Sequence, residues 1–354
     1  MTDASTLQPN AGAFAATLLR SAGRAIASHA TESLLEAHPD AGLLFGKRAY
    51  RGWHDYLTQR VDELAAAVEL GTDGLFARDI SWSVAAFAAR QVPTSTIAYG
   101  LEALQAAITA DLPPKSLALV EPILEAGIEA ARGEAVEVPR LSSGARHGGI
   151  ALEFLELVLQ GRRQDAIDHV LNAFNAGIPV GELYESVLLP VQSELGTMWH
   201  LGEVSVPEEH AATEAIRGAM SVLAHTARAR SNPKRRPGAV LVGAVEGDRH
   251  DIGVRAVADL IEIAGHTAIY LGADVPTRDL VRACETFDTA AIVLSATLTI
   301  HAPVIADAIR AIRDAGEYRV IVGGNAFGDD NTLAGRVGAD AYAPTPTKAV
   351  EMLG

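Results

Sequence analysis

The residues best suited to chemistry in this sequence lie in one short segment around His250. The segment runs from Glu246 to Gly253, and it places a carboxylate, Asp248, two residues before the histidine. An imidazole that binds a metal through one ring nitrogen needs a hydrogen-bond partner for the other, and a carboxylate often fills that role. The spacing therefore favours a metal-ligating histidine that Asp248 orients. The alternative is a loop histidine that caps the following helix.

The Asp-x-His-x-x-Gly pattern of this segment resembles the loop beneath the corrin ring in cobalamin-binding domains, as in methionine synthase and the B12-dependent mutases. The resemblance implies that His250 is the lower ligand of cobalt and that Asp248 orients it. It also implies that Gly253 lets the displaced nucleotide tail of the cofactor pass close to the backbone. Three further residues of the segment are then expected to contact the cofactor: Arg249, Asp251 and Ile252.

Two later segments carry residue types that suit a buried nucleotide tail. Ser295 and Thr297 follow one short apolar run, and Gly323-Gly324 directly follow another. The cobalamin-binding family has a Ser-x-Thr or Ser-x-Leu loop and a Gly-Gly turn at the corresponding strand ends. The resemblance implies that hydroxyl groups there hydrogen-bond the benzimidazole and that the paired glycines leave room for it.

A second constellation lies earlier in the chain, around Trp199. Nine residues separate this tryptophan from Glu209-His210, and His200 directly follows it. Together with Val206, the pattern resembles the signature of B12-dependent photoreceptors. The resemblance implies that these residues line the upper face of the cofactor and that His200 ligates cobalt after illumination, with His210 as the competing candidate. The residues alone leave an alternative open. In it, Trp199 is an ordinary core aromatic, and Glu209-His210 is a pair at the N-terminus of a helix.

The N-terminal third of the chain has no sequence pattern of a catalytic triad, metal site or phosphate loop. Its layout resembles that of the photocobilins, which join a B12 module to a helical domain that holds a bilin. The resemblance implies biliverdin held without a covalent bond, because the single cysteine, Cys284, lies far downstream. An interface or a solvated basic face is the alternative for the cations and aromatics concerned, which are Lys47, Arg48, Arg51, Trp53, His54, Trp82 and Arg90.

Helices and strands of three regions must position these residues. Residues 13–132 carry apolar residues at helical spacing, which predicts roughly six helices. Residues 150–230 indicate four short helices, typical of a small antiparallel bundle. After them, short apolar strands alternate with helical patterns, which predicts a parallel sheet with right-handed crossovers. The strands are expected at 239–245, 267–271, 290–294, 318–322 and 341–343.

The predicted fold class is a multidomain α and α/β protein, and the cobalamin resemblance implies the strand order 2-1-3-4-5. A segment rich in glycine and serine, 133–149, marks the first linker, and prolines mark the second. The predicted domains are an N-terminal all-helical domain at 1–140, a four-helix bundle at 150–232 and a flavodoxin- or Rossmann-like cobalamin-binding domain at 238–354.

Composition excludes several classes of protein. A hydrophobic content of 49% supports packed cores, but the apolar runs are too short for a bilayer span and no signal-peptide pattern is visible. One cysteine excludes an internal disulfide framework and favours the cytoplasm. A net charge of −15 makes the chain a poor partner for DNA. The one basic cluster, Lys234-Arg235-Arg236, is expected to be a solvated linker.

These observations and resemblances predict a cytoplasmic light sensor whose chromophore is adenosylcobalamin, held between the bundle and the sheet domain. Light would break the Co–C bond and shift the bundle, which would change the conformation or the oligomeric state of an expected homo-oligomer. Two other functions stay open. A corrinoid protein that carries a methyl group for a methyltransferase system shares every motif beneath the ring, and a B12 carrier without signalling is the third.

Overall fold

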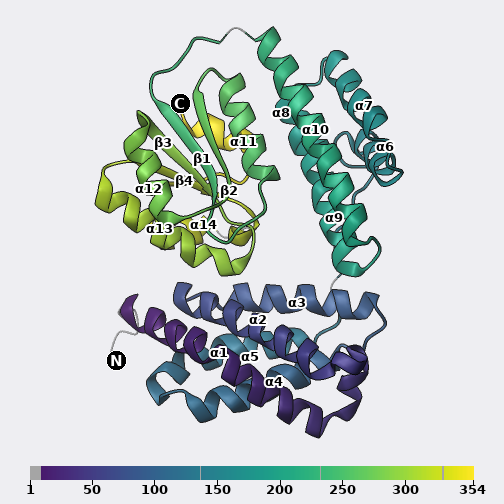
Figure 1. The fold of residues 1–354 in the computed structure, drawn as a ribbon, viewed down its shortest axis with the longest axis vertical. Coiled ribbons are helices and arrows are strands. Elements are labelled where there is room, and N and C mark those ends of the chain that lie inside the picture. The colour runs from purple at the N-terminus through teal and green to yellow at the C-terminus, as the bar shows by residue number, and fades with distance from the viewer. Residues whose placement is uncertain (1–8, 136, 232, 329–330) are drawn as a thin grey trace. The chain divides into compact units, whose positions relative to one another are not determined.

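The computed structural model describes residues 9–135, 137–231, 233–328 and 331–354. The chain divides into two compact units, Met1–Glu137 and Val138–Gly354 (Figure 1). The first unit is helical, and the second contains both a helical part and a parallel sheet. The predicted fold class is confirmed. The division into three domains stays a prediction.

Long helices build the N-terminal unit, because each buries one apolar face. Trp53, Leu57 and Phe76 are fully buried in its core. Gly71 ends one helix in the left-handed region, at φ 63°. Residues 9–135 contain five α-helices and two short 3₁₀ segments: α1 (Pro9–Ala37), η2 (Pro39–Leu44), η3 (Gly46–Arg48), α2 (Ala49–Leu70), α3 (Asp73–Ala89), α4 (Ser95–Asp111) and α5 (Pro114–Arg132).

The bundle of the second unit follows the predicted helices, with one interruption. The third helix was expected to run unbroken from Val180 to Leu201, but a π-helical turn divides it. Pro190 follows this turn and has no N–H to donate to a regular helix. The segments are α6 (Gly148–Leu159), α7 (Arg163–Asn175), α8 (Val180–Leu183), η4 (Tyr184–Leu188), α9 (Leu189–Leu201) and α10 (Val206–Arg230).

The sheet is parallel, and its strand order is β2-β1-β3-β4-β5, as the resemblance implied. All residues of the interior strand β1 are buried, because helices cover both faces of the sheet (Figure 1). The strands are β1 (Ala239–Val245), β2 (Thr267–Val275), β3 (Thr289–Ser295), β4 (Arg319–Gly323) and β5 (Ala341–Tyr342). Between and after them lie α11 (Ile252–Ile263), α12 (Thr277–Thr286), η5 (Thr299–His301), α13 (Ala302–Ala315), η6 (Asn325–Phe327), α14 (Asn331–Arg336) and α15 (Pro346–Met352).

The bundle and the sheet share one hydrophobic core along α11. Ile252, Ala256 and Leu260 of α11 belong to the same buried cluster as the bundle residues. Tyr184, fully buried in the bundle, directs its hydroxyl to Asp259 Oδ2 of α11 at 2.9 Å. The loops at the carboxyl end of the sheet therefore have a fixed relation to the bundle. Among the described residues, no helix has the length and apolar character that a membrane span requires.

We predict that Tyr184→Phe lowers the free energy of unfolding of the second unit by about 1–3 kcal/mol, because it leaves a buried carboxylate short of a donor. Denaturant titration followed by circular dichroism measures the change. Tyr50→Phe, at a tyrosine that is 43% exposed, is the control and should leave unfolding unchanged. Equal behaviour of the two variants would contradict a role for the Tyr184 hydroxyl.

Candidate functional site

The Asp-x-His-x-x-Gly segment forms the loop between β1 and α11, at the carboxyl edge of the sheet. Asp248 is fully buried in this loop, whereas the His250 side chain is 55% exposed. One carboxylate oxygen of Asp248 accepts from the His250 backbone N–H at 3.0 Å and lies 2.7 Å from His250 Nδ1. The other accepts from the Thr297 N–H at 2.7 Å. The predicted orientation of His250 by Asp248 is thus present, with Nε2 left for a ligand.

The charges of this pair support the same arrangement. Burial alone would raise the pKa of Asp248, but hydrogen bonds from His250 and from the Thr297 N–H outweigh it and lower that pKa. The hydrogen bond with Asp248 raises the pKa of His250, although partial burial opposes the rise. Asp248 is therefore a carboxylate at neutral pH, and it fixes the hydrogen on Nδ1 of His250.

Two partners of the loop were not anticipated from the sequence. Asp274, at the end of β2, accepts the Gly247 N–H at 2.6 Å and donates its own N–H to the Asp248 carbonyl at 2.8 Å. Its backbone is in the left-handed region, at φ 53°. Arg217 of α10 forms a two-pronged ion pair with Asp251, which also accepts from the Tyr270 hydroxyl. The bundle therefore contacts the loop directly, through the ion pair between Arg217 and Asp251.

A second histidine lies beside the buried carboxylate. His301 of η5 is 7% exposed, and its Nδ1 is 3.7 Å from Asp248 Oδ2. Among the described residues, this nitrogen has no hydrogen-bond partner. Burial lowers the pKa of His301, which keeps the ring neutral. The only sequence signal for His301 was its position shortly after the predicted Ser-x-Thr loop.

The residues predicted to line a nucleotide tail come together at the ends of β3 and β4. The Ala296 N–H, between Ser295 and Thr297, donates to the Gly323 carbonyl at 3.1 Å. Gly324 has φ 101°, and a Cβ at this position would lie 2.2 Å from the Ala296 carbonyl oxygen. Only glycine therefore fits this turn. At Gly253, by contrast, an added Cβ would meet nothing within 4 Å.

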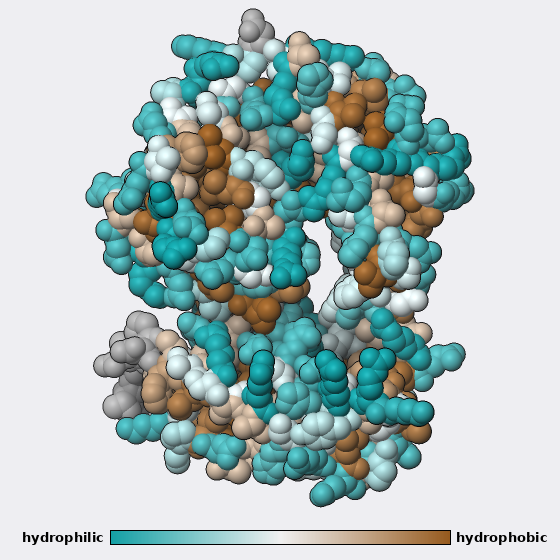
Figure 2. All heavy atoms as spheres, in the orientation of Figure 1, coloured by the Kyte–Doolittle hydropathy of each residue, from teal (hydrophilic) through white to brown (hydrophobic). Residues whose placement is uncertain are grey.

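The upper constellation lies at the junction of α9 and α10. Trp199 is 50% exposed and Val206 is 48% exposed, so Trp199 is not a core aromatic. The visible surface mixes hydrophobic and hydrophilic residues (Figure 2). Glu209 receives a hydrogen bond from Thr213 at 2.7 Å, and its charge helps raise the pKa of His250. His210 is 73% exposed.

Some predicted residues are placed elsewhere. Ile252 is 7% exposed and packs into the core shared with the bundle, so its side chain has a structural role. Arg249 is exposed. His200 is partly buried at the position after Trp199. Neighbouring helical residues point about 100° apart, so Trp199 and His200 do not share a face of α9.

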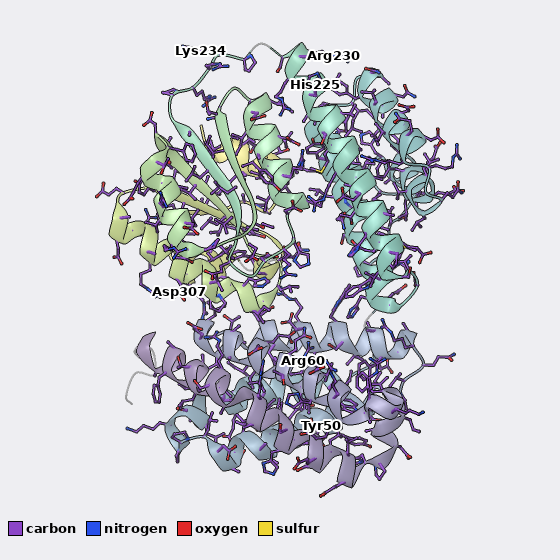
Figure 3. The ribbon with its side chains drawn as sticks, in the orientation of Figure 1. Tyr50, Arg60, His225, Arg230, Lys234 and Asp307 are labelled. Atoms are coloured by element: carbon purple, nitrogen blue, oxygen red, sulfur yellow. The ribbon has the colours of Figure 1, made fainter. Side chains whose placement is uncertain are left out.

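The cluster that motivated a bilin site is not assembled. Trp53 is fully buried, and its indole N–H donates to the Ala41 carbonyl at 2.9 Å. The Arg51 side chain is 81% exposed and pairs with Asp55. The cation in the helical interior is instead Arg60 (Figure 3), which binds Glu63 and Ser83. Biliverdin binding stays a prediction that rests on layout alone. The packing of the helices buries Trp53 and exposes Arg51. Their closeness in the sequence did not predict that they lie on different sides of the helix.

Comparison with known proteins decides the family. Two models described as B12 binding domain match residues 150–224 and 238–351. Trimethylamine corrinoid protein 1 of Methanosarcina acetivorans is 30% identical over 181 residues, 50% of this chain and 83% of that protein. This chain belongs to the B12-binding corrinoid proteins. Dimethylamine corrinoid protein 3 of the same organism is 27% identical over 205 residues, 57% of this chain and 94% of that protein.

A solved structure adds only a weak likeness. The monomethylamine corrinoid protein of Methanosarcina barkeri is 21% identical at a TM-score of 0.49, over 58% of this chain and 98% of its own. A likeness at this level does not bear on the function of the corrinoid protein described here.

The prediction of a light sensor is wrong. The relatives of this corrinoid protein are named for methylamines, which favours the methyl-carrier alternative. The prediction failed because both classes share the motifs beneath the ring, and only the residues around Trp199 pointed to light. No comparison tests the ligation of cobalt by His200 or the light-dependent oligomer, and both stay predictions.

The residues of this corrinoid protein fit cobalamin. His250 presents Nε2 because Asp248 engages Nδ1, and imidazole is a suitable ligand for cobalt. The backbone at Gly253 is open to a close approach, since nothing lies within 4 Å of its missing Cβ. A buried, fully engaged carboxylate and an accessible imidazole are what an oriented lower ligand requires.

We predict that His250→Ala weakens cobalamin binding or changes the visible spectrum of the bound cofactor. Asp248→Asn should weaken binding by about 10- to 100-fold, because it disturbs the orientation of the ligand without removing it. Titration followed by visible absorbance measures both effects, on variants whose folding is verified by circular dichroism. The control is His225→Ala, at an exposed histidine of α10 (Figure 3). Unchanged affinity and spectrum in His250→Ala would exclude it as the lower ligand.

Substitutions at two glycines should distinguish an effect on cobalamin binding from an effect on the free energy of unfolding. Gly253→Ala should leave the free energy of unfolding unchanged or raise it by up to about 1 kcal/mol, because alanine favours the helix, yet weaken cobalamin binding. Gly324→Ala should lower the free energy of unfolding by about 1–3 kcal/mol even without cofactor, because of its backbone conformation and clash. Thermal melts with and without cobalamin measure both. Full cobalamin affinity in Gly253→Ala would exclude a close approach there.

Proposed function

We propose that this protein carries a methyl group on cobalamin for a methyltransferase system. The observation that supports the proposal is the His250–Asp248 pair, in which a fully buried carboxylate orients an accessible imidazole. The pair lies at the carboxyl edge of a parallel sheet, where folds of this kind bind ligands. Membership of the corrinoid family and relatives named for methylamines support the same function.

His250 would hold cobalt from below through Nε2, and Asp248 would keep the ring in one orientation. The Thr297 N–H holds Asp248 in place at 2.7 Å, so the loop after β3 contributes to the position of the ligand. Ser295, Gly323 and Gly324 would line the cavity for the nucleotide tail. Cobalamin supplies, when bound, a cobalt centre that can accept and release a methyl group.

Trp199 and Val206 would cover the upper side of the cofactor. Both are about half-exposed in the protein, at 50% and 48%, so their apolar surfaces are available to a large ligand. Glu209 and His210 of the first turn of α10 would provide the polar part of this cover. A cover built from a helix end and a short loop excludes water while closed and leaves a partner enzyme access when displaced.

We propose methyl rather than adenosyl as the upper group, because the function that the relatives favour is methyl transfer. Methylamines are the first donors to test, since the relatives are named for trimethylamine and dimethylamine. The partner would be a methyltransferase that delivers the group to the exposed side of the cofactor.

The proposal predicts methyl transfer by the holo-protein. Protein loaded with cobalamin and reduced is mixed with trimethylamine or dimethylamine and a methylamine:cobalamin methyltransferase, and methylcobalamin is followed by its visible spectrum. We expect transfer in the wild type and a loss of about 10-fold or more in Asp248→Asn. His225→Ala should match the wild type.

Three outcomes distinguish the alternatives. Failure to bind cobalamin would exclude the proposal altogether. Tight binding without transfer from either amine, with methanol and other methyl donors equally inactive, would instead favour a B12 carrier. Transfer that is indifferent to both His250→Ala and Asp248→Asn would show that the lower ligand has been assigned wrongly.

A further inference from the structure

A basic pocket lies at the opposite edge of the sheet from the loop of His250. Its cavity is about 620 Å³, a size typical of small-molecule sites. Strand β1 has seven residues and so separates the two edges by about 20 Å. The pocket is therefore distinct from the candidate cobalamin site. Its lining consists of Lys234, Arg235, Arg236, Pro237, Val240, Ala264, His266, Ala290, Ala291, Arg319 and Leu353.

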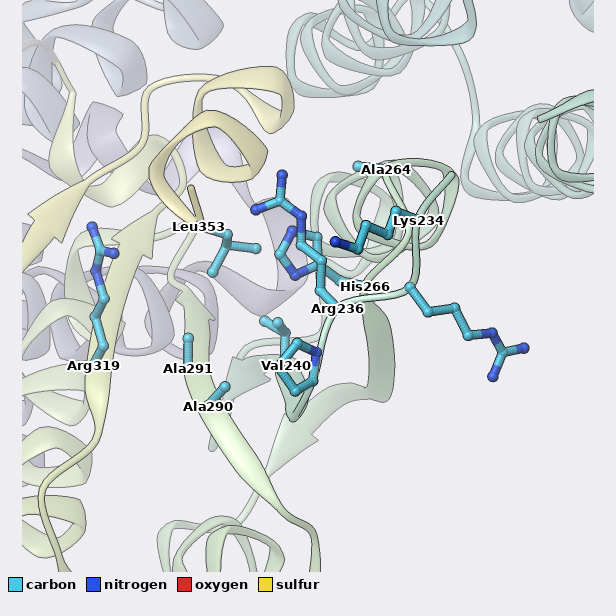
Figure 4. Close-up of a pocket in the computed structure, with 11 residues that line it drawn as sticks. Lys234, Arg236, Val240, Ala264, His266, Ala290, Ala291, Arg319 and Leu353 are labelled. Carbon is cyan, nitrogen blue, oxygen red and sulfur yellow. The ribbon is translucent and has the colours of Figure 1, made fainter. Parts of the chain in front are cut away.

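The cations of this pocket come from two segments distant in sequence. Lys234, Arg235 and Arg236 precede β1, whereas Arg319 begins β4. The strand order brings these two segments near each other. A single strand, β3, lies between β1 and β4, and its residue Ala291 pairs with Arg319. Figure 4 shows Arg319 on one side of the pocket and Arg236 on the other. The basic cluster expected to be a solvated linker is exposed, and it also forms one wall of this cavity.

These cations lack the partners that most others in this unit have. In the part of the chain that the structure describes, none of the four forms a hydrogen bond or ion pair through its side chain. By contrast, Arg217 and Arg228 are each paired with a carboxylate. Arg319 helps to lower the pKa of Asp340, but Arg313 already holds that carboxylate at 2.7 Å.

The floor of the pocket is apolar and made of small side chains. Val240 and Ala291 are neighbours in adjacent strands and are buried, and Leu353 closes one side. His266 adds a ring whose pKa is lowered by burial and by the charge of Arg236, so it is neutral. None of the residues that line the pocket is an aspartate or a glutamate. The pocket thus combines four solvent-exposed cations with a lining of small apolar side chains.

We propose that this pocket binds a small phosphorylated molecule with a flat apolar part, of the size of a nucleoside diphosphate. Guanidinium groups match phosphate oxygens in two-pronged geometry, and several of them together suit more than one phosphate group. Two small lining residues with accessible surface, Ala264 and Ala290, leave room for a ring.

The test uses the full-length protein loaded with cobalamin and isothermal titration calorimetry with ADP and inorganic pyrophosphate at low ionic strength. We expect ADP to bind with one-to-one stoichiometry and more tightly than pyrophosphate, because only ADP can use the floor. Arg236→Ala/Arg319→Ala should weaken ADP binding by about 10-fold or more, since two charged hydrogen-bond donors are lost. Binding should weaken as salt increases.

The matched control is Arg278→Ala/Arg282→Ala, which removes the same charge from exposed positions of α12 outside the pocket. It should change ADP affinity by less than about twofold, because exposed charges at a distance are screened. Absence of ADP binding, or equal weakening by both double variants, would overturn the proposal. Equal affinity for ADP and pyrophosphate would overturn the assigned apolar contact. Cobalamin occupancy, read from the visible spectrum, should not change in any variant, which separates this test from that of the cobalamin site.

Discussion

The buried carboxylate of Asp248 is the interaction on which the candidate site depends. A charge without solvent exposure is stable only if its hydrogen bonds are made, and here the donors come from its own loop and from the loop after β3. One residue thereby holds His250 in orientation and joins two neighbouring strand ends. Asp248 lies three residues after the buried strand β1, at the edge of the sheet. The packed core therefore fixes the position of the loop that contains the candidate cobalt ligand.

The same loop is held from the bundle, which relates the two sides of the proposed cofactor site. Arg217 lies two turns beyond Glu209 on one face of α10, and it pairs with Asp251 beside His250. Farther along the interface, Tyr184 and the α11 residues of the shared core fix the helices against each other. The position of Val206 relative to His250 is therefore set by α10, which carries both Val206 and Arg217.

The two edges of the sheet differ in chemistry for a topological reason. In a parallel sheet all carboxyl ends lie together, and here they carry the hydroxyl, glycine and imidazole residues. The amino ends also lie together, and they collect the cations that precede β1 and begin β4. The chain therefore has a localised basic pocket although its net charge is −15, because a net charge does not show how charges are distributed.

The sequence by itself determined the fold class, the strands to within a few residues and the Asp248–His250 pairing, because periodicity and short spacing are local properties. It could not decide between light sensing and methyl transfer, since both classes share the motifs beneath the ring. Only the tertiary structure brought Arg217, Asp274 and His301 to the loop, placed Trp53 in a core, and set Arg319 opposite Arg236. These residues lie far from their partners in the chain, and which buried charge meets which donor depends on how helices and strands pack.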